Sequence, residues 1–541
     1  MRPLLPQHDP DTDGRRRDLE DRRTDYTYDP TILPPFVLFH QLPREELFTL
    51  RYFTDRLASS ADLPANLVAV KLRSLFDRFD DLGDYDDLFA LLPRPAVADR
   101  WRDDATFAEQ RVAGTETRMV RRLDALPDPL RIDPARLAAL LGEPPARALA
   151  EGRLFLADYA LLDGIPAGAT DGRAKFLYAP LVLLHRPHGA PALAPVAIQL
   201  DQRPRPGNLF TREDGDAWLL AKTAAQAADY TLSMMAHHVQ RVHLGLESFA
   251  MATARQLSRR HPVAVLLRPH LHCVLVQEEL SRRLFVNPGG YIDRLFAPTL
   301  EGSLEIAVRS HRAWDVGAWS LEADLAARGV ADPAVLPHYP FRDDARLVHA
   351  ALAEYVQAHL RLAYPSDPDL AQDPEIHAWH GELRDPARGN LRGLPTALDR
   401  PALAHLLTEL IFLSGPYHSS LNYRQPEYAA YIPNLPMALY GPVPPGTDAV
   451  DPSALLDLLP PQRAALGQIE IINLLTSYQP DQLGHFPEDD PLTALPERRA
   501  LTDALQRRLL AVEATIEARN RARPVPYTGM LPRRLLNSAS M

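Results

Sequence analysis

The segment from Trp218 to about His261 has apolar residues at helical spacing over its whole length, and it carries two histidines, His238 and His243, five residues apart. In a regular α-helix, residues i and i+5 point roughly 140° apart, so these two imidazoles could not bind one metal ion. One π-type turn would bring both onto the same side of the helix, and such turns occur mostly at functional sites. The spacing alone favours a simpler alternative, in which one histidine lies in the core and the other faces solvent.

Composition limits the class of protein. Of the 541 residues, 46% are hydrophobic and 24% are charged, which is typical of a soluble globular protein. The net charge of −11 argues against nucleic acid as the main partner. The single cysteine, Cys273, excludes a disulfide framework and a cysteine-based metal site. The N-terminal region has no apolar run long enough for a signal peptide or a membrane span, so we expect a cytoplasmic protein. We also expect it to be a monomer.

The order of apolar and polar stretches predicts a mainly α-helical protein. Residues 1–30 have mixed charges and few apolar side chains, and we expect them to form a flexible tail before one large domain of residues 31–541. Short apolar runs bounded by glycine and proline between residues 152 and 200 predict a small β-sheet inserted in this helical domain. Helices are predicted near residues 63–79, 104–123, 273–286, 344–363, 401–414, 453–475 and 493–520.

Two further features contain possible metal ligands. His418 and Asn422 are spaced i, i+4 and would lie on one helix face, with Pro416 expected near the first turn of a restarted helix. The chain closes on an apolar residue, Met541, which suggests a buried end whose carboxylate needs a cation. Taken singly, a surface or capping pair and a terminus that rests on the surface are the more common arrangements.

Together these residues form a consistent donor set of imidazole, amide and carboxylate groups. Such donors suit iron or manganese, and one open position would leave room for water. Because the set has no thiolate, a finger-type zinc site and an iron–sulfur cluster are not expected. The candidate ligands are His238, His243, His418, Asn422 and the Met541 carboxylate.

The sequence resembles the lipoxygenase family at many ordered points. HVQRVHLGLESF (238–249) follows the family's central helix signature, and LPHYPFRDD (336–344) is similar to its Tyr-x-Tyr/Phe-Arg-Asp-Asp segment. NYRQ (422–425) resembles the family's Asn-Phe-Gly-Gln continuation, and NSASM (537–541) resembles its closing motif. The resemblance extends from about residue 35 to the end of the chain.

The resemblance implies a lipoxygenase-like helical catalytic domain with long central helices, and a non-haem iron dioxygenase with one iron per chain and manganese as the alternative metal. The five candidate ligands would hold this iron. The family's reaction is abstraction of a hydrogen atom by Fe(III)–hydroxide from a cis,cis-1,4-pentadiene, followed by O2 insertion to give a conjugated hydroperoxide. The implied partners are O2 and a polyunsaturated fatty acid of the linoleate or arachidonate type.

Several positions depart from the family's pattern. Ser281 falls where lipoxygenases usually have the alanine or glycine that sets the stereochemistry of oxygen insertion. Gln425, next to the ligands, is retained, but Met234 replaces an expected glutamine or glutamate. Phe285 falls where the family usually has an apolar leucine over the substrate. The positions implied to set the depth of the pocket all have bulky residues, which predicts a shallow pocket end: Tyr230, Leu295 and Phe296.

The resemblance begins at about residue 35, so we expect no N-terminal β-sandwich of the kind found in plant and animal lipoxygenases, and at most transient membrane contact. Two other functions remain open: a hydroperoxide isomerase at the same metal site, and a lipid-binding homologue with weak catalysis. Among neighbouring residues, His237 could exchange with His238 as a ligand, but only His238 keeps the five-residue spacing. His270 and His272 are expected to be structural or exposed, and Arg241 to be solvent-facing or ion-paired.

Overall fold

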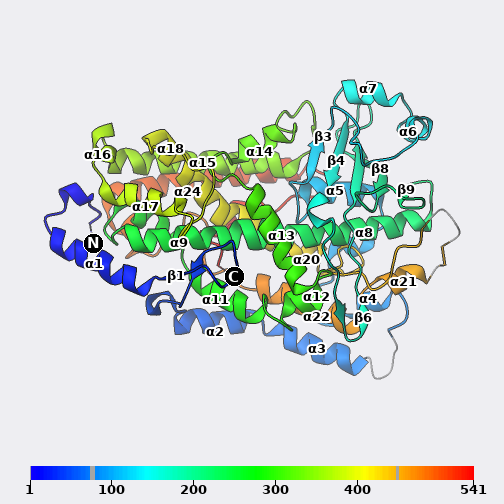
Figure 1. Ribbon diagram of the computed structural model, residues 1–541, viewed down its shortest axis with the longest axis horizontal. Coiled ribbons are helices and arrows are strands. Elements are labelled where there is room, and N and C mark those ends of the chain that lie inside the picture. Colours follow the sequence, from blue (N-terminus) through cyan, green and yellow to red (C-terminus); the bar gives the residue numbers. More distant parts are fainter. Residues whose placement is uncertain (1, 74–78, 446–449, 452, 541) are drawn as a thin grey trace.

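A long helix runs through the middle of the molecule and carries His238 and His243 (Figure 1). The computed structural model describes residues 2–73, 79–445, 450–451 and 453–540. The long helix consists of α8 (Asp216–Leu232), a π-helical segment η5 (Ser233–Leu244) and α9 (Gly245–Gln256). Fifteen of the 17 residues of α8 are buried, so this helix is surrounded by protein on all sides.

Other helices enclose the central one, as the mainly α prediction requires. α13 (Leu300–Ala313) packs against η5, and α17 (Pro374–Arg384) packs against α9. α15 (Pro340–Ala363) packs against both α18 (Arg400–Phe412) and α24 (Pro496–Asn520). Further helices are α10 (Pro262–Leu267), α11 (Val274–Leu284), α12 (Tyr291–Leu295), α14 (Leu321–Ala327), α16 (Asp367–Ala371), α20 (Gln425–Tyr428) and α23 (Pro491–Ala494).

A five-stranded antiparallel sheet lies at one end of the molecule, with α6 (Pro134–Leu141) and α7 (Pro145–Ala150) outside it (Figure 1). Its strand order is β3-β4-β7-β8-β9. The sheet predicted between residues 152 and 200 is confirmed by β4, β7 and β8. The edge strands β3 and β9 lie outside that range and were not predicted, because a three-residue strand is too short to show an alternating pattern. The bounds are β3 (Val120–Arg122), β4 (Leu154–Asp158), β7 (Leu181–His185), β8 (Ala194–Gln199) and β9 (Leu209–Thr211), with a separate small hairpin of β5 (Ala169–Thr170) and β6 (Arg173–Ala174).

Four of the predicted helices are confirmed closely by α11, α15, α18 and α24. The predicted helix 104–123 is wrong in its second half, because α5 (Asp104–Ala113) ends before Gly114 and residues 120–122 join the sheet. The predicted helix 453–475 is divided into α21 (Ala454–Leu458) and α22 (Gln462–Thr476), since Pro460 and Pro461 cannot continue a helix. α3 (Asp62–Arg73) confirms most of the predicted helix 63–79, whose residues 74–78 lie outside the described residues.

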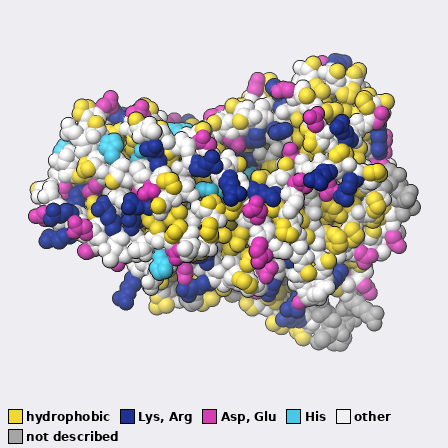
Figure 2. Space-filling view, viewed as in Figure 1, with side chains coloured by type: hydrophobic (Ala, Val, Ile, Leu, Met, Phe, Trp, Pro, Cys, Tyr) yellow, Lys and Arg dark blue, Asp and Glu magenta, His cyan; other side chains and the backbone are white. Residues whose placement is uncertain are grey.

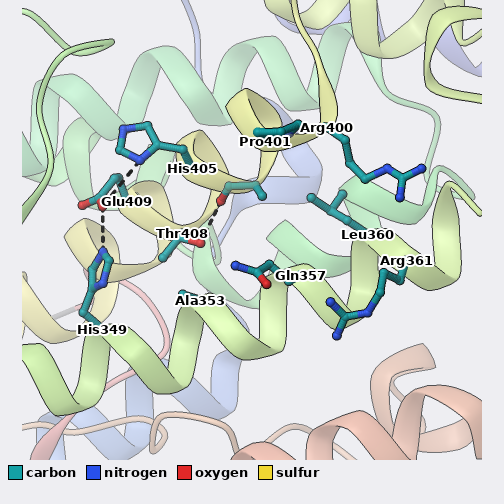
Figure 3. A pocket seen from close by; sticks show the side chains of 11 residues that line it. His349, Ala353, Gln357, Leu360, Arg361, Arg400, Pro401, His405, Thr408 and Glu409 are labelled. Atoms are coloured by element: carbon teal, nitrogen blue, oxygen red, sulfur yellow. Dashed lines mark hydrogen bonds and ion pairs between the residues drawn. The ribbon is translucent and has the colours of Figure 1, made fainter. Parts of the chain in front are cut away.

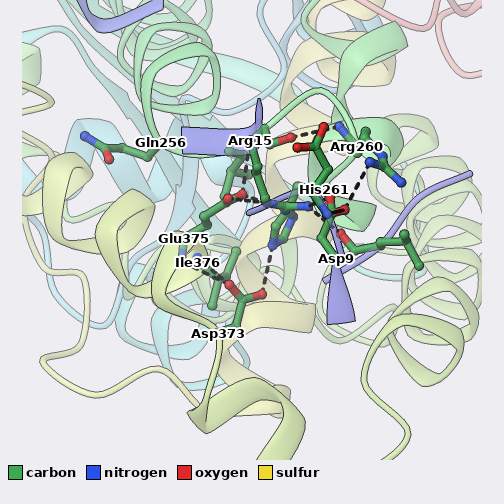
Figure 4. Close-up of polar contacts among 12 residues, drawn as sticks. Asp9, Arg15, Gln256, Arg260, His261, Asp373, Glu375 and Ile376 are labelled. Carbon is green, nitrogen blue, oxygen red and sulfur yellow. Dashed lines mark hydrogen bonds and ion pairs between the residues drawn. The ribbon is translucent and has the colours of Figure 1, made fainter. Parts of the chain in front are cut away.

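The N-terminal region differs from the expected flexible tail, because residues 12–25 form helix α1 (Thr12–Asp25), which packs against α9. Arg15 has a side chain only 4% exposed, and it donates from Nε and Nη2 to Glu375 at 2.5 and 2.9 Å (Figure 4). Its Nη1 donates to Asp9 at 3.0 Å. Low overall hydrophobicity suggested disorder, but this region is held by buried ion pairs to distant residues, which composition does not reveal.

One hydrophobic core joins the helical part, since the largest cluster of buried apolar residues extends from Leu5 to Ala539. A short pair of strands, β1 (Tyr28–Asp29) and β2 (Leu38–Phe39), connects the N-terminal region to α9. In the part of the chain that the structure describes, no helix has both the length and the apolarity to cross a bilayer.

We expect Arg15→Ala to lower the free energy of unfolding by about 3–5 kcal/mol, because it leaves the carboxylates of Asp9 and Glu375 buried without their cation. Arg16→Ala is the matched control, since Arg16 lies in the same helix with a side chain that is 68% exposed. Its surface ion pair predicts a change of about 0–1 kcal/mol. Urea unfolding followed by circular dichroism measures both, and equal effects would show that the buried network does not stabilise this region.

Candidate metal centre

The helix that carries the first two histidines is π-wound, as a metal site shared by both of them requires. The π segment η5 includes residues 233–244, and it places His238 and His243 on one side of the helix. Their Nε2 atoms lie 3.1 Å apart and their ring centroids 4.8 Å apart. The extra residue per turn of π-winding therefore removes the separation that a regular α-helix would impose.

His418 completes a group of three imidazoles. Its ring centroid lies 5.1 Å from that of His238 and 5.4 Å from that of His243. One nitrogen from each ring lies within 4.8 Å of the others, and the described residues contain no other group of three or more His, Cys, Asp or Glu side chains with such a geometry. The three predicted histidine ligands, separated by up to 180 positions in the sequence, are thus brought together.

The helix that carries His418 is also interrupted by π-winding. α18 continues without a break into η7 (Leu413–Tyr417) and then into α19 (His418–Asn422), with Pro416 inside the π segment. The expectation that a helix restarts at Pro416 is therefore wrong. Because π-winding already changes the regular i to i−4 hydrogen-bond pattern, the missing N–H of a proline is tolerated here.

The chemical state of the histidines fits a metal site. All three are buried, and neither Nδ1 of His238 nor either ring nitrogen of His418 has a hydrogen-bond partner among the described residues. Burial, and then the neighbouring histidines, lowers the pKa of His238 and of His418 well below the usual value. The rings of His238 and His418 are therefore neutral and offer lone pairs, which is the form that binds metal.

His243 has a carboxylate partner that the sequence did not reveal. Its Nδ1 lies 2.7 Å from Oε1 of Glu278, which is buried in α11. A carboxylate on Nδ1 fixes the tautomer so that Nε2 is free to bind metal, and it makes the imidazole a stronger donor. Glu278 is 35 residues from His243 and stands between Gln277 and Glu279, so the sequence does not distinguish it from a solvated acid on a surface helix.

The predicted ligand Asn422 is held in a network of amides. Its Oδ1 accepts from Nε2 of Gln425 at 2.9 Å, and its Nδ2 donates to the Leu475 carbonyl at 2.8 Å. Tyr230, expected at the end of the substrate pocket, donates its hydroxyl to Oε1 of Gln425 at 2.5 Å. Gln425 therefore links a candidate ligand to a candidate pocket residue. Met234, buried in η5, adds no hydrogen bond to this network.

The C-terminal tail runs beside the ligand helix. Residues 536–540 are buried, while Met541 lies outside the described residues. His270 contacts the tail through Nδ1, which lies 2.8 Å from the Asn537 carbonyl, and this confirms its expected structural role. A Cβ on Gly415 would overlap the Leu536 carbonyl, so only glycine lets the tail pass this close to η7.

The remaining candidate pocket residues lie on two elements. Ser281 is half-buried in α11, three residues after Glu278, and the buried Phe285 follows the end of that helix with its ring 5.6 Å from that of Tyr291. Leu295 and Phe296 close α12. The ring of Phe296 lies 5.8 Å from that of Tyr230, whereas Leu295 packs against Gly467 of α22.

Two other residues weighed from the sequence lie elsewhere. Nδ1 of His237 lies 2.5 Å from Oε2 of Glu116, and His237 is not part of the three-histidine group. The Arg241 side chain is partly buried, and burial followed by the nearby Arg118 lowers its pKa to about 10.

A crevice of about 500 Å³ opens between α15 and α18 (Figure 3). Inside it, Nε2 of His349 lies 2.6 Å from Oε1 of Glu409, and His405 points toward the same carboxylate. Its lining does not include any of the three clustered histidines, so this crevice is separate from the metal centre.

Comparisons with known proteins agree with the geometry. The family model for lipoxygenase matches residues 72–527. Linoleate 9/13-lipoxygenase of Pseudomonas aeruginosa is 34% identical over 481 residues, which are 85% of this chain and 70% of that protein. The human hydroperoxide isomerase ALOXE3 is 32% identical over 495 residues, which are 88% of this chain and 68% of that protein. An anaerobic crystal structure of a LOX deletion variant in complex with arachidonate matches with a TM-score of 0.92 at 26% identity, covering 100% of this chain and 84% of that one.

We expect Gly415→Ala to weaken metal binding by roughly 10-fold or more, because the new methyl group displaces the tail that packs beside the ligand helix. Gly381→Ala in α17 is the control, since a Cβ there has no atom within 4 Å. Helix propensity predicts that this control gains roughly 0.5–1 kcal/mol of stability. Metal titration of both variants decides the point, and unchanged affinity in Gly415→Ala would contradict a role for the tail.

Proposed function

This chain belongs to the lipoxygenase family, and we propose that it adds O2 to polyunsaturated fatty acids with a cis,cis-1,4-pentadiene to give conjugated hydroperoxides. The family defines a dioxygenase that uses a catalytic metal. The observation that carries the proposal is the group of three buried imidazoles on two helices that each contain a π-wound segment. The similarity to a bacterial linoleate lipoxygenase supports the fatty-acid substrate.

The proposed ligands are His238, His243, His418, Asn422 and the carboxylate of Met541. This mixture of nitrogen and oxygen donors without a thiolate suits iron, which we propose as the resident metal, with manganese as the alternative. When bound, the metal supplies a one-electron redox centre able to remove a hydrogen atom from the doubly allylic methylene group.

The protein's own contribution is to fix the donors and to keep the site dry. Glu278 holds His243 in one tautomer through the 2.7 Å contact on Nδ1, so that Nε2 stays unprotonated. The amide network around Gln425 orients the oxygen of Asn422. Burial of the whole group excludes bulk water, which strengthens these interactions and protects a radical intermediate from side reactions.

We propose that the substrate chain lies along α11 and the end of α12. Ser281 would stand at the family's position for product stereochemistry, and Phe285, Leu295, Phe296 and Tyr230 would form the apolar walls. Because Ser281 and Glu278 are on the same helix, the side chain that borders the substrate and the one that orients a ligand move together. The hand of the product is therefore coupled to the geometry of the metal site.

A second candidate function is hydroperoxide isomerisation at the same site. The similarity to a hydroperoxide isomerase at 32% identity favours it, as does the bulk of the proposed pocket walls. The two functions differ in their use of O2, since an isomerase consumes an added hydroperoxide without net O2 uptake.

We expect the purified protein to take up O2 and form conjugated dienes with linoleate or arachidonate, and His238→Ala to abolish both along with metal binding. His188→Ala is the control, because the side chain of His188 is 77% exposed in a surface turn. An oxygen electrode and diene absorbance measure activity, and mass spectrometry of the metal content distinguishes iron from manganese. Full O2 uptake by His238→Ala would refute the metal centre.

We expect Glu278→Gln to lower metal affinity and kcat by roughly 10- to 100-fold, since glutamine keeps a hydrogen-bond acceptor for His243 but removes the charge. Glu279→Gln is the matched control. Glu279 follows Glu278 in the same helix, and its carboxylate forms ion pairs with Arg282 and Arg283. Metal titration, steady-state kinetics and the thermal unfolding of the metal-free protein separate positioning from simple destabilisation. A variant that unfolds at a lower temperature but binds metal normally would contradict the positioning role.

A further inference from the structure

The loop that follows α5 lies in the interior of the protein. It consists of residues 114–119 and joins α5 to β3, and its residues 114–118 are all buried. Connecting segments normally run over the surface, because irregular backbone has polar groups that water must satisfy. A buried loop has to find other partners for these groups, and it can reach elements that no surface loop contacts.

Side chains supply the partners of the loop's backbone. The backbone N–H of Arg118 donates to Oε1 of Glu116 at 2.7 Å. The hydroxyl of Tyr339, which is itself buried, donates to the Thr117 carbonyl. Because buried backbone groups are costly to leave unpaired, these contacts hold the loop in one conformation.

The loop contacts the first ligand helix through Glu116. Its Oε2 lies 2.5 Å from Nδ1 of His237 in η5, and the two side chains are only 0% and 6% exposed. Most charged side chains in Figure 2 lie on the surface with both signs interspersed, where an ion pair contributes little. The contact of Glu116 with His237 is shielded from water, so loss of one partner leaves the other buried and unpaired. His237 directly precedes the proposed ligand His238.

The same loop contacts the second ligand helix through Arg118. The guanidinium carbon of Arg118 lies 5.0 Å from the centroid of the Tyr417 ring, which is within the range of a cation–π interaction. Tyr417 is buried at the end of η7 and directly precedes the proposed ligand His418. Two residues of one loop therefore contact the chain neighbours of two different ligands.

An ion pair holds Arg118 over the Tyr417 ring. Nη2 and Nε of Arg118 donate to the two carboxylate oxygens of Asp324 in α14, at 2.7 and 3.3 Å. Burial raises the pKa of Asp324, but Arg118 and Arg328 outweigh this effect and hold that pKa below its usual range. The carboxylate is therefore ionised. The ring of Trp319, 5.2 Å from the guanidinium carbon of Arg118, restricts it further.

Both contacts fall on π-wound segments of the ligand helices. His237 lies within η5 (Ser233–Leu244), and Tyr417 is the last residue of η7 (Leu413–Tyr417). Because π-winding is rare in proteins, it depends more than α-winding on contacts from outside the helix. The loop supplies one such contact to each segment.

We propose that Glu116 and Arg118 are positioning residues that fix the separation of His238 and His418. The ring centroids of these two histidines lie 5.1 Å apart although they come from different helices. A loop that holds the residue before each ligand limits how far one helix can turn or slide relative to the other. The inference rests on the proposed function, since it concerns the ligands of the proposed metal centre.

The contact with the first ligand helix is tested by Glu116→Gln, which removes the charge opposite His237. We expect it to weaken binding of Fe(II) to the full-length protein roughly 10-fold, the lower end of the effect of residues that orient a metal ligand. The electron paramagnetic resonance spectrum of the oxidised, iron-loaded protein should change in rhombicity, because it reports ligand geometry. Glu109→Gln is the matched control, since Oε2 of Glu109 also lies 2.7 Å from a histidine nitrogen, in His338. It should leave both measurements unchanged.

The contact with the second ligand helix is tested by Arg118→Lys. Lysine keeps a cation for Asp324 but loses the planar group that stacks on Tyr417, and we expect the same roughly 10-fold loss and change in rhombicity. Arg328→Lys is the matched control. Arg328 also pairs with Asp324, at 2.7 Å, but its guanidinium lies over the Tyr339 ring. This control should bind iron as the unaltered protein does.

The double variant E116Q/R118K tests whether the loop couples the two helices. Its loss of affinity should be smaller than the product of the two single effects, because either change alone already frees the separation of the ligands. Thermal unfolding of the metal-free variants identifies a residue that only stabilises the fold, since such a residue lowers the unfolding temperature without changing the affinity or the spectrum.

Unchanged affinity and spectra in both single variants, or equal changes in the two controls, would overturn the inference. Single effects that multiply in full in E116Q/R118K would also overturn it, because the two contacts would then act independently. These outcomes leave the proposed function intact. Failure of the unaltered protein to bind iron would instead overturn the proposed metal centre, and with it this inference.

Discussion

Three imidazoles buried around one point impose the constraint on which the rest of this structure depends. A buried polar atom without a partner costs roughly 1–3 kcal/mol, and His238 and His418 together have three such nitrogens among the described residues. The surrounding core must hold these rings in place against that cost, which metal binding would offset. This explains why the helices that carry the ligands are buried on all sides, whereas most helices of globular proteins have one solvated face.

Two long helices meet this constraint by the same local device. Each one changes from α to π winding where it approaches the metal centre, in η5 and in η7. In η7, Gly415 and Pro416 are two of the residues least compatible with an α-helix. Both occur where the winding is not α-helical and where the chain tail needs room. Their low helix propensity is therefore matched to the geometry that the site requires.

The sequence predicts the parts of this architecture that rest on local spacing. The five-residue interval between His238 and His243 fits a shared metal ion only if the helix is π-wound, and it pointed to π-winding only together with the other candidate ligands. Apolar periodicity predicted α11, α15, α18 and α24. Long-range contacts were not predictable in the same way. The pairing of Glu278 with His243 and the burial of Arg15 beside Glu375 depend on residues that meet only after folding, and neither acid differs in the sequence from a solvated one. The family resemblance identified the candidate ligands, but the carboxylate that contacts His243 became visible only in the three-dimensional structure.

Helix α11 carries residues that contact the proposed metal centre and border the proposed substrate site. Its residue Gln277 contacts Tyr52 of α2 (Leu50–Ser59), Glu278 contacts His243, and Ser281 lies one turn further along. A helix is stiff over this length, because each turn is fixed by its own backbone hydrogen bonds. Glu278 and Ser281 therefore keep a fixed spacing on this helix. The contact that orients His243 and the residue at the proposed border of the substrate site are consequently positioned by one rigid element.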